Sequence, residues 1–392
     1  MILMMENLVK VLAVADPAVN VYVKPEYSIL NKFKATHGID VEFDIIPFEN
    51  YYEKLMKAFA GELDYDMVMV AGHLWLKDFV SKDYLAQLTE PSDKAYDEMD
   101  ITEVVRDEMK IDGKKYLYPS FCDGHIMLYR KSMIEPVYGK INKKSITTDE
   151  YLDIARKYYK ETSKPSVAMK AHESEIFLDI LPFIRNEGIE PFDENTNMPQ
   201  LDDIGCLNAL NKYLELKSYA VSGTENFAND EVRKAFQNKE VPMTITWGGQ
   251  LGMVMDENCI DKEDVGFLAL NTSWNVTWSF GVSKASSRKD KAIKLLEYLT
   301  SKEVDRYVGS YAGSPVRKST YEADKDNYPW YEIHYDLVTK YAKPLPKMLN
   351  AGKLMEPIYK GVYSVFTDKA LPASALKEMH NQVMKLKMEE SK

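Results

Sequence analysis

The sequence has few of the features that mark several common protein classes. It contains only three cysteines, Cys122, Cys206 and Cys259, whose spacing fits neither a CxxC pair nor a zinc ribbon. So sparse and odd a set argues against a disulfide framework, although it does not by itself define the compartment. No apolar run approaches the roughly 18 residues that a membrane-spanning helix needs, and the mean hydropathy is −0.37. A disulfide-stapled domain and a membrane-spanning helix are therefore excluded.

Sequence motifs for catalysis and cofactor binding are also missing. There is no GxGxxG, GxxxxGKS/T, GxSxG or HExxH pattern, which removes the signals for nucleotide-binding, α/β-hydrolase and zincin sites. The six histidines never pair at i and i+4, so we expect no metal site and no cofactor. A metal site assembled from distant segments stays open.

Basic residues are outnumbered by acidic ones. The 392 residues include 50 Lys and Arg against 61 Asp and Glu, which gives a net charge of −11. Nucleic-acid binding needs a concentrated basic surface, so we expect no nucleic-acid partner. The chain is nevertheless rich in aromatic residues, with 26 Tyr, 14 Phe and 5 Trp, and its length suffices for two or three domains or two large lobes.

The N-terminal residues do not have the pattern of an export signal. Glu6 and Lys10 stand where the apolar core of a signal peptide would lie, and no basic segment or cleavage site accompanies them. We therefore expect the chain to start at or near the mature N-terminus, with any export signal absent from this sequence.

The first part of the chain alternates between strand and helix patterns. Strands are predicted at Leu8–Ala15, Ile39–Ile46 and Tyr65–Val70, and helices at Lys24–Thr36, Asn50–Ala60 and Leu74–Tyr84. On the second helix, Tyr52, Leu55 and Phe59 share the predicted buried face with Met56. This βαβαβα order is typical of a mostly parallel sheet.

The pattern after Lys114 is mixed. Strands are predicted at 115–118 and 125–129 around a polar turn at 120–124, and again at 241–247, 265–270 and 277–283. Helices are predicted at 148–160, 175–186, 202–219, 230–238 and 290–300. Thr147 and Glu150 form a predicted capping box, and Asp290 is a predicted N-cap.

The strand and helix at Thr277–Thr300 resemble the βα units at the start of the chain, which indicates that the chain returns to its first lobe. We predict an α/β fold of two lobes, each a mostly parallel sheet flanked by helices, joined by crossing segments. The N-terminal lobe is predicted at 1–117 with 277–310, and the C-terminal lobe at 118–276 with 311–392. Because α/β sheets bind ligands beyond the carboxyl ends of their strands, a ligand cleft is expected between the lobes.

Polar and aromatic residues gather where the predicted strands end. The first strand runs into Asp16 and Asn20, and the third into His73 and Trp75. The remaining candidates lie at strand ends or presumed crossings: Phe121, Asp123, Trp247, Gly248, Gly249, Trp274, Trp278 and Tyr311. Asp16 could equally serve as an N-cap, and any one tryptophan could equally fill a core.

These residue types suit a sugar. A pyranose has an apolar C–H face and a hydroxyl rim, which aromatic rings and polar side chains can match. The pair Gly248 and Gly249, just after a strand, would let the backbone approach a ligand closely and offer helix-start N–H groups to it. The candidate set therefore favours carbohydrate binding.

Several short segments occur in the order and approximate spacing of one known family. They are Leu8–Asn20, Phe59–Val70, Asp112–Pro119, Leu128–Lys131, Met243–Gly249, Phe280–Ser286, Lys291–Glu303 and Ser314–Arg317. Through them, essentially the whole chain resembles the extracellular solute-binding proteins of bacterial ABC importers, specifically the sugar-binding group that includes maltose-binding protein.

The resemblance implies a two-lobed fold of the type II periplasmic-binding-protein class that closes on its ligand. Asp16, Asp123 and Trp247 match ligand-contacting positions of that group. His73 stands where maltose-binding proteins have a sugar-binding acid, and no basic residue lies beside it, so maltose itself is not the expected ligand.

The function implied is that of a non-enzymatic, extracytoplasmic binding protein, in the periplasm or at the cell surface as a secreted protein or lipoprotein. It would bind a carbohydrate, with an oligosaccharide favoured, and deliver it to ABC permease subunits as a monomer. Iron, polyamines, phosphate or peptides are alternative ligands for this fold. A glycan-active hydrolase using Asp16 and Asp123, or a sensor subunit, also stays open.

Overall fold

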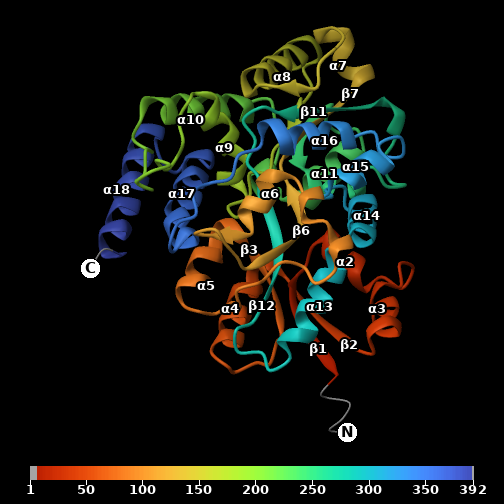
Figure 1. Ribbon diagram of the computed structural model, residues 1–392. Helices are drawn as coiled ribbons and strands as arrows, with labels where there is room; N and C mark the ends of the chain where they lie inside the picture. Colours follow the sequence, from red (N-terminus) through yellow and green to blue (C-terminus); the bar gives the residue numbers. More distant parts are fainter. Residues whose placement is uncertain (1–6, 391–392) are drawn as a thin grey trace. The chain divides into compact units, whose positions relative to one another are not determined.

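The computed structural model describes residues 7–390 and divides into two compact units (Figure 1). Unit 1 comprises residues 7–123, Val276–Tyr331 and Lys347–Leu349, and unit 2 comprises Gly124–Asn275, Glu332–Pro346 and residues 350–390. The predicted lobe limits differ from the unit limits chiefly because 118–123 and 311–331 pack within unit 1, as do residue 276 and residues 347–349. Met1–Glu6, the start of the predicted signal-free N-terminus, lies outside the described residues.

Unit 1 is built on a five-stranded sheet in the order β2-β1-β3-β12-β6. Its strands are β1 (Leu8–Val14), β2 (Asp40–Ile46), β3 (Met67–Ala71), β6 (Leu117–Asp123) and β12 (Val276–Val282). Its helices are α2 (Pro17–Val23), α3 (Ile29–His37), α4 (Phe48–Phe59), α5 (Lys77–Ser81), α6 (Glu103–Glu108), α13 (Lys289–Leu299), α14 (Lys302–Tyr311) and α15 (Lys318–Asp324). The short strands β4 (Lys110–Ile111) and β5 (Lys114–Lys115) form a separate antiparallel pair.

In the sheet of unit 1, one strand runs against the other four. β1 is parallel to β2 and β3, whereas β12 is antiparallel to both β3 and β6. Figure 1 shows the cyan β12 beside the orange β3, although these strands are distant in sequence. The prediction of mostly parallel strands is therefore confirmed for four of the five strands, and β12 makes the sheet mixed. β12 is the strand that arrives from the chain of unit 2, so no crossover helix within the sheet makes it parallel to β3.

Unit 2 repeats this plan with the order β8-β11-β7-β10-β9. Its strands are β7 (His125–Arg130), β8 (Ser145–Ile146), β9 (Val167–Ala168), β10 (Met243–Trp247) and β11 (Val265–Leu270). Its helices are α7 (Lys131–Tyr138), α8 (Thr148–Thr162), α9 (Ile176–Asn186), α10 (Ile204–Lys217), α11 (Asn229–Gln237), α12 (Leu251–Val254), α16 (from Tyr331 to Asp336), α17 (Ala351–Phe366) and α18 (Pro372–Glu390). The reversed strand is β7, which enters from the chain of unit 1 and is antiparallel to β10 and β11.

Local side-chain chemistry explains where several helices begin. The capping box of α8 is confirmed, since the Thr147 hydroxyl accepts from the Glu150 N–H at 3.1 Å and the Glu150 carboxylate accepts from the Thr147 N–H at 3.0 Å. Asp290 is not an N-cap, because α13 begins one residue before it at Lys289. It stands instead in the first turn, where a carboxylate favours the helix N-terminus.

Two predicted helices were misplaced. The helix predicted at 24–36 begins only at Ile29. A separate short helix, α2, precedes it and starts directly after Asp16, with Pro17 in its first turn. The predicted helix at 74–84 is a π-helical turn over Gly72–Leu76 followed by the short α5.

The predicted polar turn over residues 120–124 is wrong. All of its residues except Gly124 belong to β6, which pairs with β12 as far as Asp123 opposite Val276. The polar side chain of Ser120 is accommodated in this buried strand because its hydroxyl hydrogen bonds to that of Tyr22 at 2.6 Å.

The buried face of α4 was also assigned incorrectly in part. Tyr51 and Leu55 are fully buried, whereas Tyr52 is 44% exposed. The Tyr51 hydroxyl donates to the Met69 carbonyl at 2.7 Å, which satisfies its polar atom inside unit 1. The buried face of α4 therefore includes Tyr51 in place of the predicted Tyr52.

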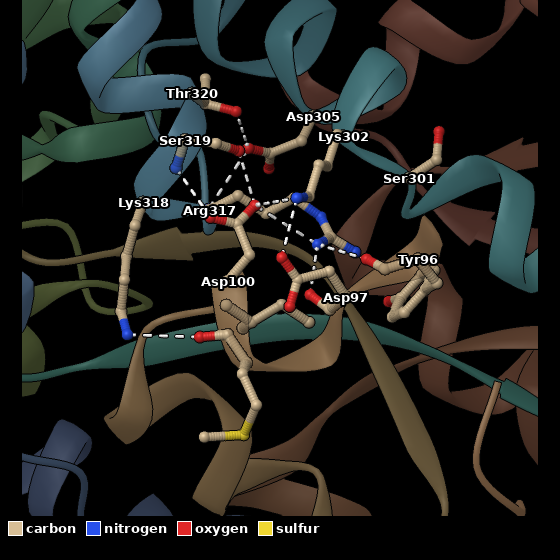
Figure 2. A network of polar contacts seen from close by, with 12 residues as sticks. Tyr96, Asp97, Asp100, Ser301, Lys302, Asp305, Arg317, Lys318, Ser319 and Thr320 are labelled. Carbon is tan, nitrogen blue, oxygen red and sulfur yellow. Dashed lines mark hydrogen bonds and ion pairs between the residues drawn. The ribbon is translucent and has the colours of Figure 1, made fainter. Parts of the chain in front are cut away.

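A buried arginine holds the segment after α14 on unit 1 (Figure 2). The Arg317 side chain is fully buried and stacks on the Tyr96 ring, with its guanidinium carbon 4.4 Å from the ring centroid. Its guanidinium donates to the carbonyl oxygens of Thr300 at 2.8 Å, Tyr96 at 2.9 Å and Asp97 at 3.0 Å. A buried cation is stable only with such partners, so these bonds tie 314–317 to 96–100 and to the end of α13.

Two aspartates complete the network drawn in Figure 2. Asp305 accepts from the Val316 N–H at 2.9 Å and from the Thr320 hydroxyl at 2.5 Å. Asp100 accepts from the Ser319 N–H at 2.8 Å and from its hydroxyl at 2.5 Å. These contacts explain why 311–331 packs with unit 1 instead of with the C-terminal part of the chain.

Candidate functional site

Most candidate residues of unit 1 lie at one edge of its sheet. The carboxyl ends of β1, β2 and β3 meet there, because Val14 pairs with Ile46 and β3 continues the same direction. β12 starts at this edge and β6 ends at it, as shown by the pairs Trp278–Ala71 and Val276–Asp123. The candidates brought to this edge are Asp16, Asn20, His73, Trp75, Phe121, Asp123 and Trp278.

Asp16 joins two roles that the sequence left as alternatives. Its carboxylate accepts from the Ala18 N–H at 2.8 Å and thereby caps α2. Although the side chain is partly exposed, desolvation raises the pKa of Asp16 to about 8, and the negative charge of Asp123 contributes to the rise. At neutral pH the Asp16 carboxyl group is therefore largely protonated and can donate a hydrogen bond as well as accept one.

An aromatic cluster lies at the same edge of the sheet. Trp75 contacts Trp278 edge-on with ring centroids 5.7 Å apart, and it stacks with Phe48 at 6.5 Å and tilts toward Tyr52 at 5.4 Å. Trp75 itself is buried, whereas Phe48 is 50% and Tyr52 is 44% exposed. The exposed rings extend the cluster outward from the sheet edge, which is the arrangement that an apolar C–H face can contact.

Two other candidates of unit 1 are more deeply buried. Burial lowers the pKa of His73 to about 3, so its imidazole is neutral at neutral pH. Phe121 is fully buried and pairs in β6 opposite Trp278. Phe121 therefore supports the Trp278 position from the neighbouring strand.

Asn20 lies in the middle of α2, and Tyr311 lies at the end of α14. Asn20 is exposed on α2. Tyr311 is the last residue of α14, and the Lys24 ammonium lies 4.5 Å from its ring centroid. The sequence did not indicate Lys24 as a site residue. Its position directly after α2 was the one signal that could have done so.

The candidates of unit 2 gather at the corresponding edge of the second sheet. Trp247 ends β10 and is buried, with the His125 ring 4.4 Å away and the Trp274 ring 6.4 Å away. The Lys170 ammonium lies 3.9 Å from the centroid of the Trp247 ring. Sequence reasoning missed both Lys170 and His125, although each stands at the edge end of a strand.

Gly248, the first of the two glycines after Trp247, makes close contacts within the protein. The Gly248 N–H donates to the Gly124 carbonyl at 2.9 Å, so it is already used within the protein. A side chain at Gly248 would lie only 2.3 Å from the His334 ring, so the close approach that glycine permits is to this buried histidine. Gly249 is buried in the same short 3-10 turn, Gly248–Gln250.

Trp274 belongs to a polar junction inside unit 2. It is fully buried, and its backbone N–H donates to Nδ1 of His125 at 3.3 Å. His125 Nε2 lies 2.9 Å from the Leu178 carbonyl, which makes Nε2 the protonated nitrogen. The adjacent Ser273 hydroxyl accepts from the backbone N–H of His125 at 2.7 Å.

Arg185 fastens this junction to a second segment. Its buried guanidinium donates to the Ser273 carbonyl at 2.9 Å and to the Lys343 carbonyl at 2.8 Å. The Lys343 and Asn275 N–H groups close the two segments into a ladder, at 3.1 Å each. Trp274 therefore serves a structural role here, and Arg185, which the sequence did not indicate, is central to it.

Two further properties bear on the kind of site. Within residues 7–390, no group of three or more His, Cys, Asp or Glu side chains is placed to hold a metal ion. Over the same range, no helix combines the length and the apolar character needed to cross a membrane.

Residues 18–306 match the family described as bacterial extracellular solute-binding protein. The chain belongs to this family. The match covers about three quarters of the chain, from α2 to α14. A solute-binding protein of this family is an extracellular binding protein and is not normally an enzyme.

Solved structures show the fold of this solute-binding protein. It resembles maltose-bound MalE3 of T. maritima with a TM-score of 0.84 and 21% identity over 97% of this chain and 99% of that one. An ABC transporter solute-binding protein of Agrobacterium vitis with bound D-mannitol gives 0.83 and 20% over 98% and 99%. One from Agrobacterium radiobacter in complex with ribitol gives 0.84 and 18% over 97% and 98%. The predicted two-lobed, maltose-binding-protein-like fold of type II is confirmed, with mixed sheets.

Proposed function

We propose that this protein is the extracytoplasmic solute-binding component of an ABC importer and that its solute is a carbohydrate, with an oligosaccharide favoured. The observation that carries the proposal is that one sheet edge of unit 1 holds both an aromatic cluster, which exposes Phe48 and Tyr52, and the carboxyl groups of Asp16 and Asp123. Exposed rings next to hydrogen-bonding carboxyl groups suit a pyranose, which has an apolar face and a hydroxyl rim.

The solved relatives support this choice of ligand class. The similar proteins from T. maritima, A. vitis and A. radiobacter hold maltose, D-mannitol and ribitol, respectively. Maltose itself is not proposed for this chain, because the neutral His73 replaces the acid expected at that position. A neutral imidazole offers one donor and one acceptor, whereas a carboxylate accepts twice.

The proposed mechanism is lobe closure. We propose that unit 1 contributes the carboxyl pair and the aromatic cluster, and unit 2 contributes Trp247. A sugar that contacts both lobes binds the closed state better than the open one and therefore shifts the equilibrium toward closure. The closed protein, acting as a monomer without catalysis, would deliver the sugar to the permease subunits.

The test is a thermal-shift and tryptophan-fluorescence screen against monosaccharides, polyols and oligosaccharides. A sugar that binds the native state raises the melting temperature, by mass action. We expect Phe48→Ala to weaken binding of the best sugar by about tenfold, the loss expected for about 1.4 kcal/mol of stacking contact. Tyr159→Ala removes a ring of α8 that is 40% exposed, against 50% for Phe48, and serves as the matched control with unchanged affinity. The absence of any shift across the whole panel would refute carbohydrate binding.

A glycan-active hydrolase is the second candidate. The elevated pKa of Asp16, about 8, next to Asp123 is the property that a general acid needs. Turnover of a chromogenic glycoside that Asp123→Asn abolishes would establish it. We expect no turnover, since the family is one of binding proteins.

A further inference from the structure

Unit 2 holds a lysine in an unusual environment at its sheet edge. Lys170 follows β9, which runs parallel to β10 with Ala168 opposite Thr244, so Lys170 and Trp247 reach the same end of the sheet. The Lys170 side chain is fully buried, and its ammonium lies 3.9 Å from the centroid of the Trp247 ring. At this distance the cation lies against a face of the indole.

Nearby groups balance the charge of Lys170. Asp179 is buried on α9, and although desolvation raises its pKa to about 6, the positive charge of Lys170 opposes that rise. The carboxylate is therefore ionised at neutral pH, and it accepts from the Tyr213 hydroxyl at 2.7 Å. Burial, followed by the charge of Lys170, holds the pKa of His125 well below its usual value, so the His125 ring beside the indole is neutral while the Lys170 ammonium is charged.

Packing alone does not account for a lysine at this position. A buried ammonium costs several kcal/mol of desolvation unless it is paired. A methionine would fill nearly the same volume without that cost, and it would not require the nearby charge of Asp179. What the ammonium adds is attraction to the face of one particular ring, Trp247.

We propose that Lys170 is a positioning residue that fixes the indole of Trp247 in a single orientation for ligand contact and closes one of its faces to the ligand. Trp247 then meets a sugar with its remaining surface only. The inference rests on the proposed function in treating Trp247 as a ligand contact. The fixing of the ring by Lys170 can be measured without a ligand.

The ligand-free test uses protein carrying ¹⁵N-labelled tryptophan, whose 5 indole N–H groups give 5 resonances. Trp247→Phe identifies the resonance of Trp247. We expect Lys170→Met to shift or split that resonance and to leave the other four in place. The matched control is Lys157→Met, which removes an ammonium that lies 4.7 Å from the centroid of the Tyr138 ring. This variant should move none of the five indole resonances.

An unchanged Trp247 resonance in Lys170→Met would overturn the proposal. So would a shift of all five, which would mean that Lys170 supports the whole unit. If Lys170→Met does not fold, Lys170→Gln applies the same criterion with a polar side chain, and Lys170→Arg should preserve the wild-type spectrum.

The second readout is affinity for the best sugar of the screen. We expect Lys170→Met to weaken binding by tenfold or more, and Lys170→Arg to restore most of the loss. A Trp247 resonance that moves without any change in affinity would contradict the role in ligand contact. If the wild-type protein binds no sugar, the proposed function fails, whereas the indole spectrum still decides whether Lys170 fixes the ring.

Discussion

At the residue scale, the same side chains serve the fold and the candidate site. Asp16 caps α2 through the Ala18 N–H and, beside Asp123, has a pKa raised to about 8. The sequence presented capping and ligand contact as alternatives for this residue. In the structure they are compatible, because one carboxylate oxygen makes the cap bond and a carboxyl group can make further hydrogen bonds.

The raised pKa of Asp16 predicts how stability depends on pH. Between its ordinary value of 3.8 and about 8, the folded protein holds a proton at Asp16 that the unfolded chain has lost. The folded state binds more protons, so Asp16 makes stability fall as the pH rises through this window. Asp16→Asn keeps a good N-cap and removes the charge, and it should flatten the fall when melting temperature is measured against pH.

Asp193 provides a control of opposite sign. Hydrogen bonds from the backbone and side chain of Thr196 hold the pKa of Asp193 below its ordinary value. Its stabilisation is therefore present above the unfolded pKa and is lost as the pH falls. Asp193→Asn should lower the melting temperature by a constant amount between about pH 4 and 8 and remove the pH dependence only in more acidic solution. An equal change of slope between pH 4 and 8 in both variants would contradict the assignment to Asp16.

At the scale of elements, buried arginines fasten segments that lie outside the main sheets and are otherwise joined only by isolated bridges. Arg317 joins 314–317 to the end of α13, and Arg185 joins 273–275 to 343–344. A guanidinium has several donors in fixed directions, so it can satisfy carbonyl groups from separate segments at once. This is how irregular segments become fixed parts of each unit.

Arg317 predicts the cost of breaking such a junction. Arg317→Met should destabilise the protein by about 3–5 kcal/mol in urea denaturation, because the carbonyl groups of Thr300, Tyr96 and Asp97 lose their buried donor. Arg306 is the matched control, since its ion pair with Asp324 is on a side chain that is 54% exposed.

We expect Arg306→Met to cost no more than about 1 kcal/mol, as for other exposed ion pairs. Similar losses in the two variants would mean that the Arg317 contacts do not hold the segment.

At the scale of the whole molecule, the proposed function requires ligand contacts from both units. A saturating sugar should then lower the radius of gyration measured by small-angle X-ray scattering, as the lobes close. At 100 times its Kd the sugar should also stabilise the native state by about 2.7 kcal/mol. Both effects come from binding to one native conformation.

Single substitutions in either unit test this directly. Trp278→Ala in unit 1 and Trp247→Ala in unit 2 should each weaken binding and reduce the compaction at a fixed sugar concentration. Trp330→Phe is the control: this buried ring donates to the Gly313 carbonyl at 3.0 Å within unit 1. Full compaction in either alanine variant would show that one unit binds the sugar alone.

The sequence by itself determined the fold class and most of the elements. Alternating apolar residues placed β1, β2 and β11 almost to the residue, and the Thr147–Glu150 box placed the start of α8. These signals are local, because the residues that create the pattern also form the element. The family resemblance and the positions of Asp16, His73 and Trp278 at strand ends likewise came from the linear chain.

Only the tertiary structure decided which strands run backwards, which polar groups are paired and which rings are exposed. The sequence could not show that Ser120 lies inside β6, because its partner Tyr22 is distant in the chain. Nor could it show that Gly248 makes room for His334 or that Lys170 lies against Trp247. Each depends on a contact between segments far apart in sequence. Such contacts leave no local periodicity, so only folding defines them.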